Sequence, residues 1–274
     1  MCKLKSAIIL KNRIFMPDYD SHSQMLEELG IKDSYLNASK TFVRAELSPV
    51  NGDPFSDIDK WALSVDQDIT PDWFDVEDCE ARMREAVKEW AKTHIYIGVD
   101  NLTISSGENY YIKDCHDVVV CGSAEIQRVC NFATIQNVYG SATIQYVGDS
   151  ATIQNVFDSA TIQRVCNSAT IQNVCDSATI QNVRGSATIQ YVFDSATIQN
   201  VCGSATIQYV FDSATIQRVC NFATVTSSDI FDWENSGSVI LCDNATFKDC
   251  KTKTIYQAGD WKLVSVVEKR GNES

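Results

Sequence analysis

Residues 122–226 carry a hydrophobic pattern that repeats every nine positions. Each unit reads [D/G/N]-S-A-T-I-Q-x-V-x, and we number its positions 1 to 9 from the turn residue. Ala at position 3 and Ile at position 5 flank an outward-facing Thr, which is the alternation of a β-strand. The three-residue step from Ile to Val at position 8 predicts a bend near the Gln of position 6. A fixed short period of this kind is typical of a solenoid of stacked coils.

Position 1 is Gly, Asp or Asn in every unit, from Gly122 to Asn221. These residues tolerate a positive φ best, so we expect each unit to turn there through a left-handed conformation. The invariant Ala at position 3 is expected to occupy the tightest point of the core.

Position 9 indicates the length of one coil. The two alternating sets of units carry at this position Tyr139, Phe157, Cys175, Phe193 and Phe211 in one set, and Cys130, Gly148, Cys166, Arg184, Cys202 and Cys220 in the other. All aromatic residues fall in one set and all but one Cys in the other, which predicts two units, or 18 residues, per coil. The fold class is therefore mainly β, a parallel β-solenoid in which Asn137, Asn155 and Asn173 form an amide ladder.

The flanking segments predict further units. Residues 1–96 read as a small acidic α+β domain, with strands at "SAIIL", "RIFMP", "TFVRAEL" and "WALSV" and a first helix capped near Asp20 or Ser21. A long helix over 76–94 is expected to have Asp75 as its N-cap and to bury the face that Val76 begins. Residues 97–121 are expected to form an N-terminal solenoid cap, and 227–274 a C-terminal β cap or dimer contact, with strands at "SVILC", "NATFKDC", "TIYQ" and "WKLVSVVEK".

The charge is uneven along the chain. Residues 1–121 hold −9 of the formal net charge of −13, whereas the repeat is nearly neutral. This balance argues against direct nucleic-acid binding by a basic surface and favours a basic protein partner. No apolar run approaches the ~20 residues of a membrane helix, and "MCKLKSAIILKNRIF" does not read as a signal peptide, so we expect a cytoplasmic location and no membrane partner.

No pattern in the sequence indicates catalysis or a cofactor. P-loop, dinucleotide-binding and zinc-protease motifs are absent. Cys115, His116 and Asp117 have the residue types of a thiol site, but neighbours on a strand point to opposite faces. Cys121 could join Cys115 and His116 around zinc, although no C-x-x-C spacing is present. The repeat lacks the paired glycines and regular Asp of a calcium roll, the flat hydroxyl array of an ice-binding surface and the charge density of a DNA mimic. We therefore expect no metal and no enzyme activity, and the Cys stack is expected to be reduced and structural.

Two sets of residues are candidates for partner binding. The stretch "DQDITPDWFDVEDCE", residues 66–80, concentrates seven acids around two aromatic residues. Acids of the helix N-terminus explain some of that charge but not Asp66, Asp68 and Asp72, which we expect to ring Trp73 and Phe74 in a docking surface. The second set comprises outward-facing residues at position 7 of the repeat: Tyr146, Arg164, Tyr191, Tyr209 and Arg218.

The pairing of "SAIILKNRIFMPDYDSHSQMLEELGIKDSYLNASKTFVRAELSP" and "PDWF" with tandem "SATIQ" units resembles a group of nonapeptide-repeat β-solenoid proteins of gut bacteria, phages and mobile elements. The resemblance spans most of the chain. It implies an accessory gene whose product handles a host protein, and it carries no functional residues over. Pentapeptide-repeat proteins, which include inhibitors of nucleic-acid enzymes, offer an analogy at the level of fold.

These observations favour an interaction protein in which a rigid solenoid and an acidic N-terminal domain bind a host protein, as an inhibitor of a host or defence factor. A structural solenoid that stacks or polymerises is the alternative. An enzyme activity in the N-terminal domain is a third and weaker hypothesis.

Overall fold

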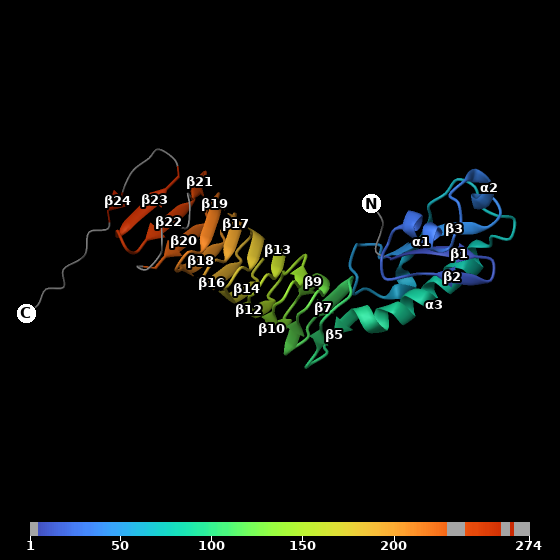
Figure 1. Cartoon of the computed structure of the whole chain (residues 1–274), viewed down its shortest axis with the longest axis horizontal. Helices are drawn as coiled ribbons and strands as arrows, with labels where there is room; N and C mark the ends of the chain where they lie inside the picture. The colour runs from blue at the N-terminus through green and yellow to red at the C-terminus, as the bar shows by residue number, and fades with distance from the viewer. Residues whose placement is uncertain (1–4, 229–238, 259–263, 266–274) are drawn as a thin grey trace, which may run out of the picture. The chain divides into compact units, whose positions relative to one another are not determined.

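A computed structural model describes residues 5–228, 239–258 and 264–265. The chain divides into two compact units (Figure 1). The first contains residues 1–96 and 108–111, and the second contains residues 97–107 and 112–274. We describe each unit by itself.

The N-terminal unit is built on a four-stranded antiparallel sheet with the order β2-β1-β3-β4. Its strands are β1 (Lys5–Leu10), β2 (Arg13–Phe15), β3 (Phe42–Ser48) and β4 (Ala62–Val65). Its helices are α1 (His22–Glu28), α2 (Tyr35–Ala38) and α3 (Val76–His94), with the 3-10 turn η1 (Ile58–Lys60). The Ser21 side chain caps α1, in agreement with the sequence prediction.

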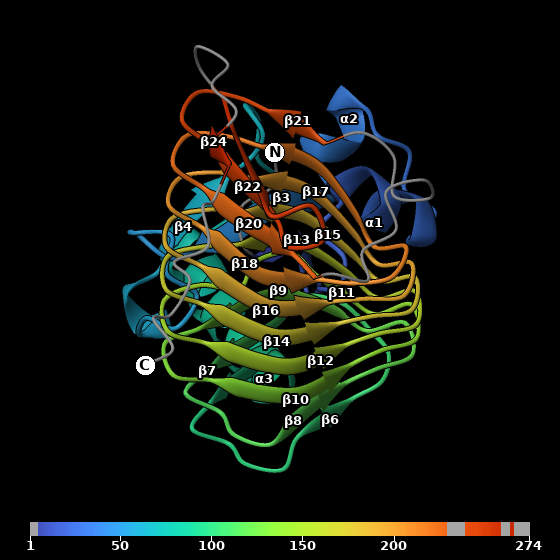
Figure 2. The ribbon, with the colours of Figure 1, turned by 90° about the vertical axis from the view of Figure 1, so that its left-hand side faces the viewer.

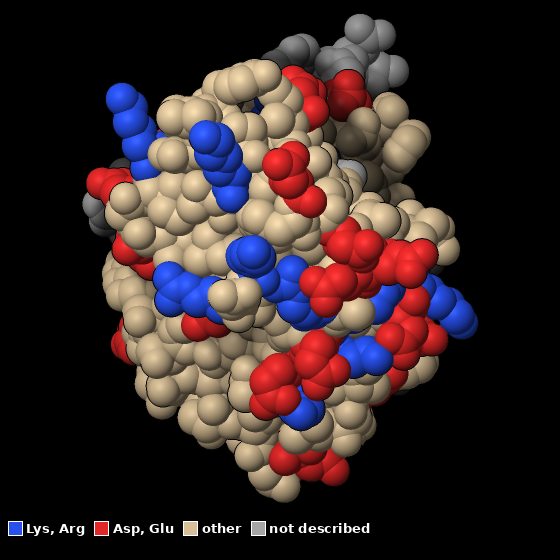
Figure 3. Space-filling model, turned by 90° about the vertical axis from the view of Figure 1, so that its right-hand side faces the viewer, with Lys and Arg blue, Asp and Glu red and all other residues tan. Residues whose placement is uncertain are grey.

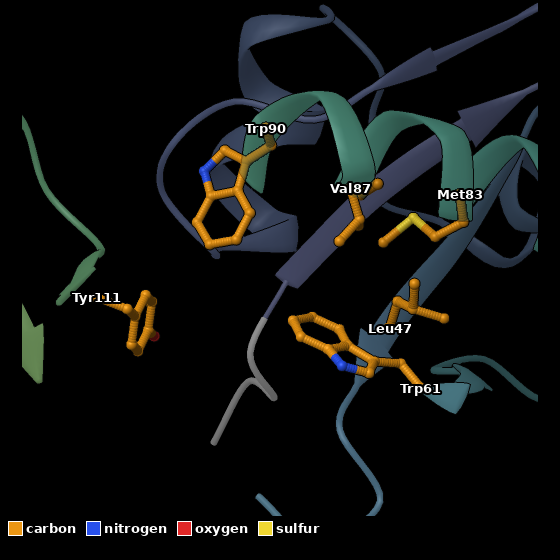
Figure 4. Packing of buried hydrophobic residues seen from close by; sticks show 7 residues of the cluster. Leu47, Trp61, Met83, Val87, Trp90 and Tyr111 are labelled. Carbon is orange, nitrogen blue, oxygen red and sulfur yellow. The ribbon is translucent and has the colours of Figure 1, made fainter. Parts of the chain in front are cut away.

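The two faces of this sheet have different cores. On one face, Ile8 and Phe42 pack against Met25 and Leu26 of α1. On the other face, α3 directs Met83, Val87 and Trp90 toward Leu47 of β3 and Trp61 (Figure 4). This arrangement follows from strand alternation, because successive residues of β1 and β3 point to opposite sides.

Helix α3 occupies the predicted range and begins as predicted. The Asp75 side chain accepts a hydrogen bond from the Asp78 N–H at 2.8 Å, which satisfies one of the unpaired amides of the first turn. The predicted buried face is correct from Cys79 onward but wrong at Val76, which is half exposed. Val76 lies in the first turn, before the helix reaches the sheet.

The second unit is a parallel β-solenoid made of two sheets. One sheet has eleven strands in the order β24-β23-β22-β20-β18-β16-β14-β12-β10-β8-β6, and the other has nine in the order β21-β19-β17-β15-β13-β11-β9-β7-β5. The strands are β5 (Ile95–Ile97), β6 (Thr103–Ile104), β7 (Tyr110–Lys113), β8 (Val118–Val120), β9 (Glu125–Cys130), β10 (Thr134–Val138), β11 (Thr143–Ile144), β12 (Thr152–Val156), β13 (Thr161–Val165), β14 (Thr170–Val174), β15 (Thr179–Val183), β16 (Thr188–Val192), β17 (Thr197–Val201), β18 (Thr206–Val210), β19 (Thr215–Val219), β20 (Thr224–Ser227), β21 (Ile240–Leu241), β22 (Thr246–Asp249), β23 (Thr254–Gln257) and β24 (Val264–Ser265).

The coil length of 18 residues is confirmed by the register of the strands. Ile153 pairs with Ile171 in one sheet, and Ile162 pairs with Ile180 in the other. Consecutive nine-residue units therefore alternate between the sheets, and the same position of every second unit stacks in one row (Figure 2). Position 6 is skipped in this pairing, as between Ile153 and Asn155, which is the local irregularity expected near the Gln.

The interior of the solenoid consists of the three predicted apolar positions. The Ala, Ile and Val of positions 3, 5 and 8 are fully buried throughout the repeat. Position 1 has a positive φ in every unit from Gly122 to Asn221, as the Gly, Asp and Asn there predict. Gly122 has a second reason to be Gly, because a Cβ atom on it would lie 2.3 Å from the Ser105 carbonyl oxygen.

The solenoid extends beyond the regular repeat at its C-terminal end. The predicted strands in "SVILC" and "NATFKDC" are parallel to the repeat and in register with it, since Ile240 pairs with Arg218 and Thr246 with Thr224. Asp243 takes position 1 of this coil with φ +57°. The antiparallel strands β23 and β24 then follow β22. The predicted strand "WKLVSVVEK" lies outside the described residues except for 264–265.

The close packing of position 3 generates a prediction about stability. Replacing the fully buried Ala178 with Leu should overpack the core and lower the free energy of unfolding by about 1–3 kcal/mol. Replacing its neighbour Thr179, which faces outward, with Val should have little effect. Thermal melts followed by circular dichroism compare the two variants, and equal melting temperatures would refute the inward assignment of Ala178.

Candidate functional site

The outward-facing row at position 7 of the eleven-stranded sheet changes from Asn to Tyr along the solenoid. Asn155 donates a hydrogen bond from Nδ2 to Asn137 Oδ1 at 3.0 Å, and Asn173 donates to Asn155 at 2.9 Å. The predicted amide ladder is therefore confirmed in this row. The next two members of the row are Tyr191 and Tyr209, which replace the amides with two phenol rings.

Tyr191, Tyr209 and Phe211 form an exposed cluster that we call the aromatic patch. The rings of Tyr191 and Tyr209 are stacked, with centroids 5.7 Å apart and planes inclined by 14°. The ring centroid of Phe211, at position 9, lies 6.1 Å from that of Tyr191 and 6.2 Å from that of Tyr209. Although Phe193 and Phe211 occupy neighbouring coils of one row, Phe211 packs on the two Tyr rings instead of on Phe193. Tyr191 and Tyr209 remain 40% and 43% exposed, so this aromatic surface is available to a partner.

Four carboxylates form a row at the turn that directly follows position 9 of this sheet. We call this row the acid ladder. It consists of the position 1 residues Asp158, Asp176, Asp194 and Asp212. Each Oδ2 accepts a hydrogen bond from the backbone N–H of position 1 one coil earlier, as from Asp158 to Asp176 at 3.2 Å. These bonds hold like charges in register at about 4.8 Å, the spacing of neighbouring strands.

The carboxylates of the acid ladder lie next to the position 9 row, which carries aromatic residues, and they raise the pKa of a thiol in that row. Asp194 directly follows Phe193, and Asp212 directly follows Phe211. Cys175 occupies the same row, between Phe157 and Phe193, and the pKa of its thiol is raised to about 11 by burial first and then by the carboxylates of Asp176, Asp194 and Asp158. An aromatic surface and a negative potential therefore coincide at this corner.

The remaining candidates at position 7 lie on the other sheet. Tyr146 is engaged there, because the Arg128 guanidinium lies 5.4 Å from its ring centroid and Asn167 Nδ2 donates to its hydroxyl at 3.3 Å. Arg164 pairs in register with Asn182, and Arg218 with Ile240. The structure thus separates Tyr146, Arg164 and Arg218 from the Tyr191 and Tyr209 pair, and the five residues do not form one surface.

The aromatic residues of the 66–80 stretch pack against the core of the N-terminal unit. Trp73 and Phe74 are half-buried against the cluster of Ile9, Val43, Ala45 and Cys79. The Trp73 Nε1–H donates to the Lys40 carbonyl at 2.8 Å. Asp72 is exposed beside them. On the face shown in Figure 3, acidic side chains lie among basic ones.

The other two predicted acids, Asp66 and Asp68, line a pocket of about 540 Å³ in the N-terminal unit. Asp33, Tyr35 and Arg44 lie in the same wall, and Arg44 is paired with Asp33. Sequence reasoning selected these acids for their charge but gave no indication of a cavity. The pocket arises because the chain after β4 passes the residues that precede and form α2.

One group of possible metal ligands was missed by the sequence analysis. Single ligand atoms of His22, Glu46 and Asp66 lie within 4.8 Å of one another. The residues come from α1, β3 and the end of β4, so no spacing motif joins them. The one local signal is Glu46, an acid within the predicted strand "TFVRAEL".

The thiol motif of residues 115–117 is structural. Cys115 is fully buried, and burial raises the pKa of its thiol, which is opposite to what a nucleophile needs. His116 is exposed, with Nδ1 3.2 Å from Thr134 Oγ1. Asp117 accepts a hydrogen bond from Gln136 at 2.8 Å.

Comparisons with protein-family models, with curated proteins and with solved structures give no match for the chain. Among the described residues, no helix combines the length and the apolar character needed to cross a bilayer. The local geometry of the sites is therefore the basis for assigning a function.

The acid ladder generates a prediction that separates charge from fold. Asn221 occupies position 1 and accepts from the Gly203 N–H with Oδ1 at 3.3 Å, so Asn can replace Asp in this bond. Changing Asp176, Asp194 and Asp212 together to Asn removes repulsion between stacked charges. The melting temperature at low salt should be equal or higher, and the difference should shrink at high salt. A large loss at both salt concentrations would show that the carboxylates themselves hold the coils.

Proposed function

We propose that the chain is a non-enzymatic protein-binding scaffold, in which the solenoid presents the aromatic patch and the acid ladder to a basic segment of a partner protein. The proposal depends on one observation, the coincidence of exposed Tyr191 and Tyr209 with a row of carboxylates at one corner of the rod. Aromatic residues are enriched in binding hot spots, and neighbouring charges raise the association rate and select the partner by sign.

The rigidity of the solenoid supports this role. The aromatic patch lies on strands whose Ala, Ile and Val side chains are fully buried. The backbone of each coil is bonded to the next, as where the Phe211 N–H donates to the Val192 carbonyl at 2.9 Å. A surface on such a scaffold loses little conformational freedom on binding, so more of the contact energy appears as affinity.

The combination that sequence analysis sought in residues 66–80 therefore has a better counterpart on the solenoid. Trp73 and Phe74 are used by the core, whereas Tyr191 and Tyr209 project from the repeat. In our proposal, Asp66, Asp68 and Asp72 contribute charge to the N-terminal unit, and Trp73 and Phe74 do not anchor a partner there.

The identity of the partner rests on the resemblance described above. We propose a host protein as the target and inhibition of a host or defence factor in the cytoplasm as the outcome. The alternative of end-to-end polymerisation has less support, because in the eleven-stranded sheet β23 pairs antiparallel with β22 and covers the edge of that last parallel strand. A homodimer through residues 227–274 stays a prediction.

The repeat itself suggests the variant that tests the aromatic patch. Asn is the residue at position 7 in the three preceding coils of this row, so Tyr191→Asn with Tyr209→Asn should extend the amide ladder and preserve the fold. Loss of two hot-spot side chains should weaken partner binding about 30-fold or more. Partners captured from host lysate by the unmodified chain are identified, and their affinities are measured by biolayer interferometry.

The matched control is Arg218→Asn, at position 7 of the opposite sheet, which should bind as tightly as the unmodified chain. The triple Asp-to-Asn variant should bind more weakly, mainly at low salt. Equal binding by the Tyr variant, or loss of binding in Arg218→Asn, would contradict the proposal.

A further inference from the structure

We propose that His22, Glu46 and Asp66 bind one divalent transition-metal ion in the N-terminal unit. One imidazole and two carboxylates form a donor set that suits ions accepting both nitrogen and oxygen, such as Mn²⁺ or Zn²⁺. This site is independent of the solenoid surface described above.

The geometry of His22 prepares one ring nitrogen for a cation. His22 is the first residue of α1 and is buried, with Nε2 3.3 Å from the Ala45 carbonyl oxygen. A carbonyl oxygen only accepts, so this contact places a proton on Nε2, and Nδ1 is the nitrogen that can present its lone pair to a cation. Fixing the tautomer of a ligating His through a backbone carbonyl is a common feature of metal sites.

The Nδ1 atom faces a carboxylate at a suitable separation. It lies 3.5 Å from Asp66 Oδ2. Two ligands that each lie ~2.0–2.2 Å from a metal are separated by roughly 3–3.5 Å. A small inward movement of the exposed Asp66 side chain is sufficient to complete the bonds.

Glu46 supplies a second and independent reason to infer a cation. The residue is only 7% exposed, and among the described residues no hydrogen bond or ion pair engages its carboxylate. The nearby cation on the same strand face, Arg44, is paired with Asp33. A largely buried carboxylate that has no protein partner is unfavourable, and a bound metal ion would reduce that cost.

A second polar group without a hydrogen-bond partner, the Ser6 hydroxyl, lies next to Glu46. Ser6 pairs directly with Glu46 in the antiparallel register, so the two side chains share a face of the sheet. The Ser6 hydroxyl oxygen is also buried and has no hydrogen-bond partner. An ion bound directly by Glu46 would also give the Ser6 hydroxyl a hydrogen-bond partner through its bound water.

Asp66 connects the three ligand atoms to solvent. Its backbone N–H donates to the Arg44 carbonyl at 2.9 Å, which holds the end of β4 against β3. Its side chain is 66% exposed and lines the 540 Å³ pocket together with Asp68. The exposed side chain of Asp66 therefore gives an ion a path from solvent to the three ligand atoms.

Manganese is the better probe because the chain contains eleven Cys, whose thiolates bind zinc. The purified full-length chain is titrated with Mn²⁺, and free Mn²⁺ is counted by electron paramagnetic resonance. We expect one saturable site per chain and a melting temperature that rises with Mn²⁺.

Two variants and one matched control locate the site. Glu46→Gln, which keeps the shape and removes the buried charge, should weaken Mn²⁺ binding at least tenfold, while the metal-free protein should be as stable as the parent or more stable. Asp66→Asn, at an exposed position, should weaken binding without affecting the fold. Asp68→Asn changes the same pocket outside the three ligands and should leave binding unchanged. The proposal is overturned if the parent has no saturable site, if Glu46→Gln binds Mn²⁺ as tightly as the parent, or if Asp68→Asn loses binding.

Discussion

The stacking of 18-residue coils in register is the constraint on which the solenoid depends. A coil of this size is too thin to enclose a core alone, and its backbone amides and carbonyls need partners in the coils on either side. Stacking meets both needs, since Ile153 lies on Ile171 while their strands share a continuous hydrogen-bond ladder. Each interior position therefore has to be filled by nearly the same volume in every coil, which is why Ala, Ile and Val recur with so little change.

The same constraint determines the chemistry of the outer surface. A side chain at a given position stacks on its own kind at the strand spacing, so outward residues need to tolerate self-contact. Asn155 does so through a ladder of amides, and Tyr191 does so by stacking its ring on Tyr209. Carboxylates repel in such a row, and the acid ladder exists because each Asp accepts a backbone N–H from the preceding coil. A row of identical charges or rings is thus a direct product of the architecture, and it offers a partner a regular, rigid surface.

The N-terminal unit follows a different logic. Its chemistry does not repeat along the sequence but converges from separate elements on one face of a four-stranded sheet. His22 opens a helix, Glu46 lies within a strand and Asp66 follows another. The opposite face is filled by α3 and its apolar side chains, which leaves the α1 face to hold both an apolar cluster and a polar one. Such a mixture within one layer is costly unless a bound group satisfies the polar members.

The sequence by itself determined the solenoid, because the information there is local and repeated. Nine residues specify a turn at position 1, an inward pattern of three apolar residues and, through the alternation of aromatic residues and Cys at position 9, a coil of two units. The helix at 76–94 and its Asp75 cap were predictable for the same reason, since caps and amphipathic spacing act within a few residues. Tertiary structure alone decided which outward residues share a surface. It placed Tyr146 and Tyr209 on different sheets, used Trp73 in the core and brought Glu46 to His22 across 24 residues of chain, because these contacts depend on how distant segments pack and not on spacing along the sequence.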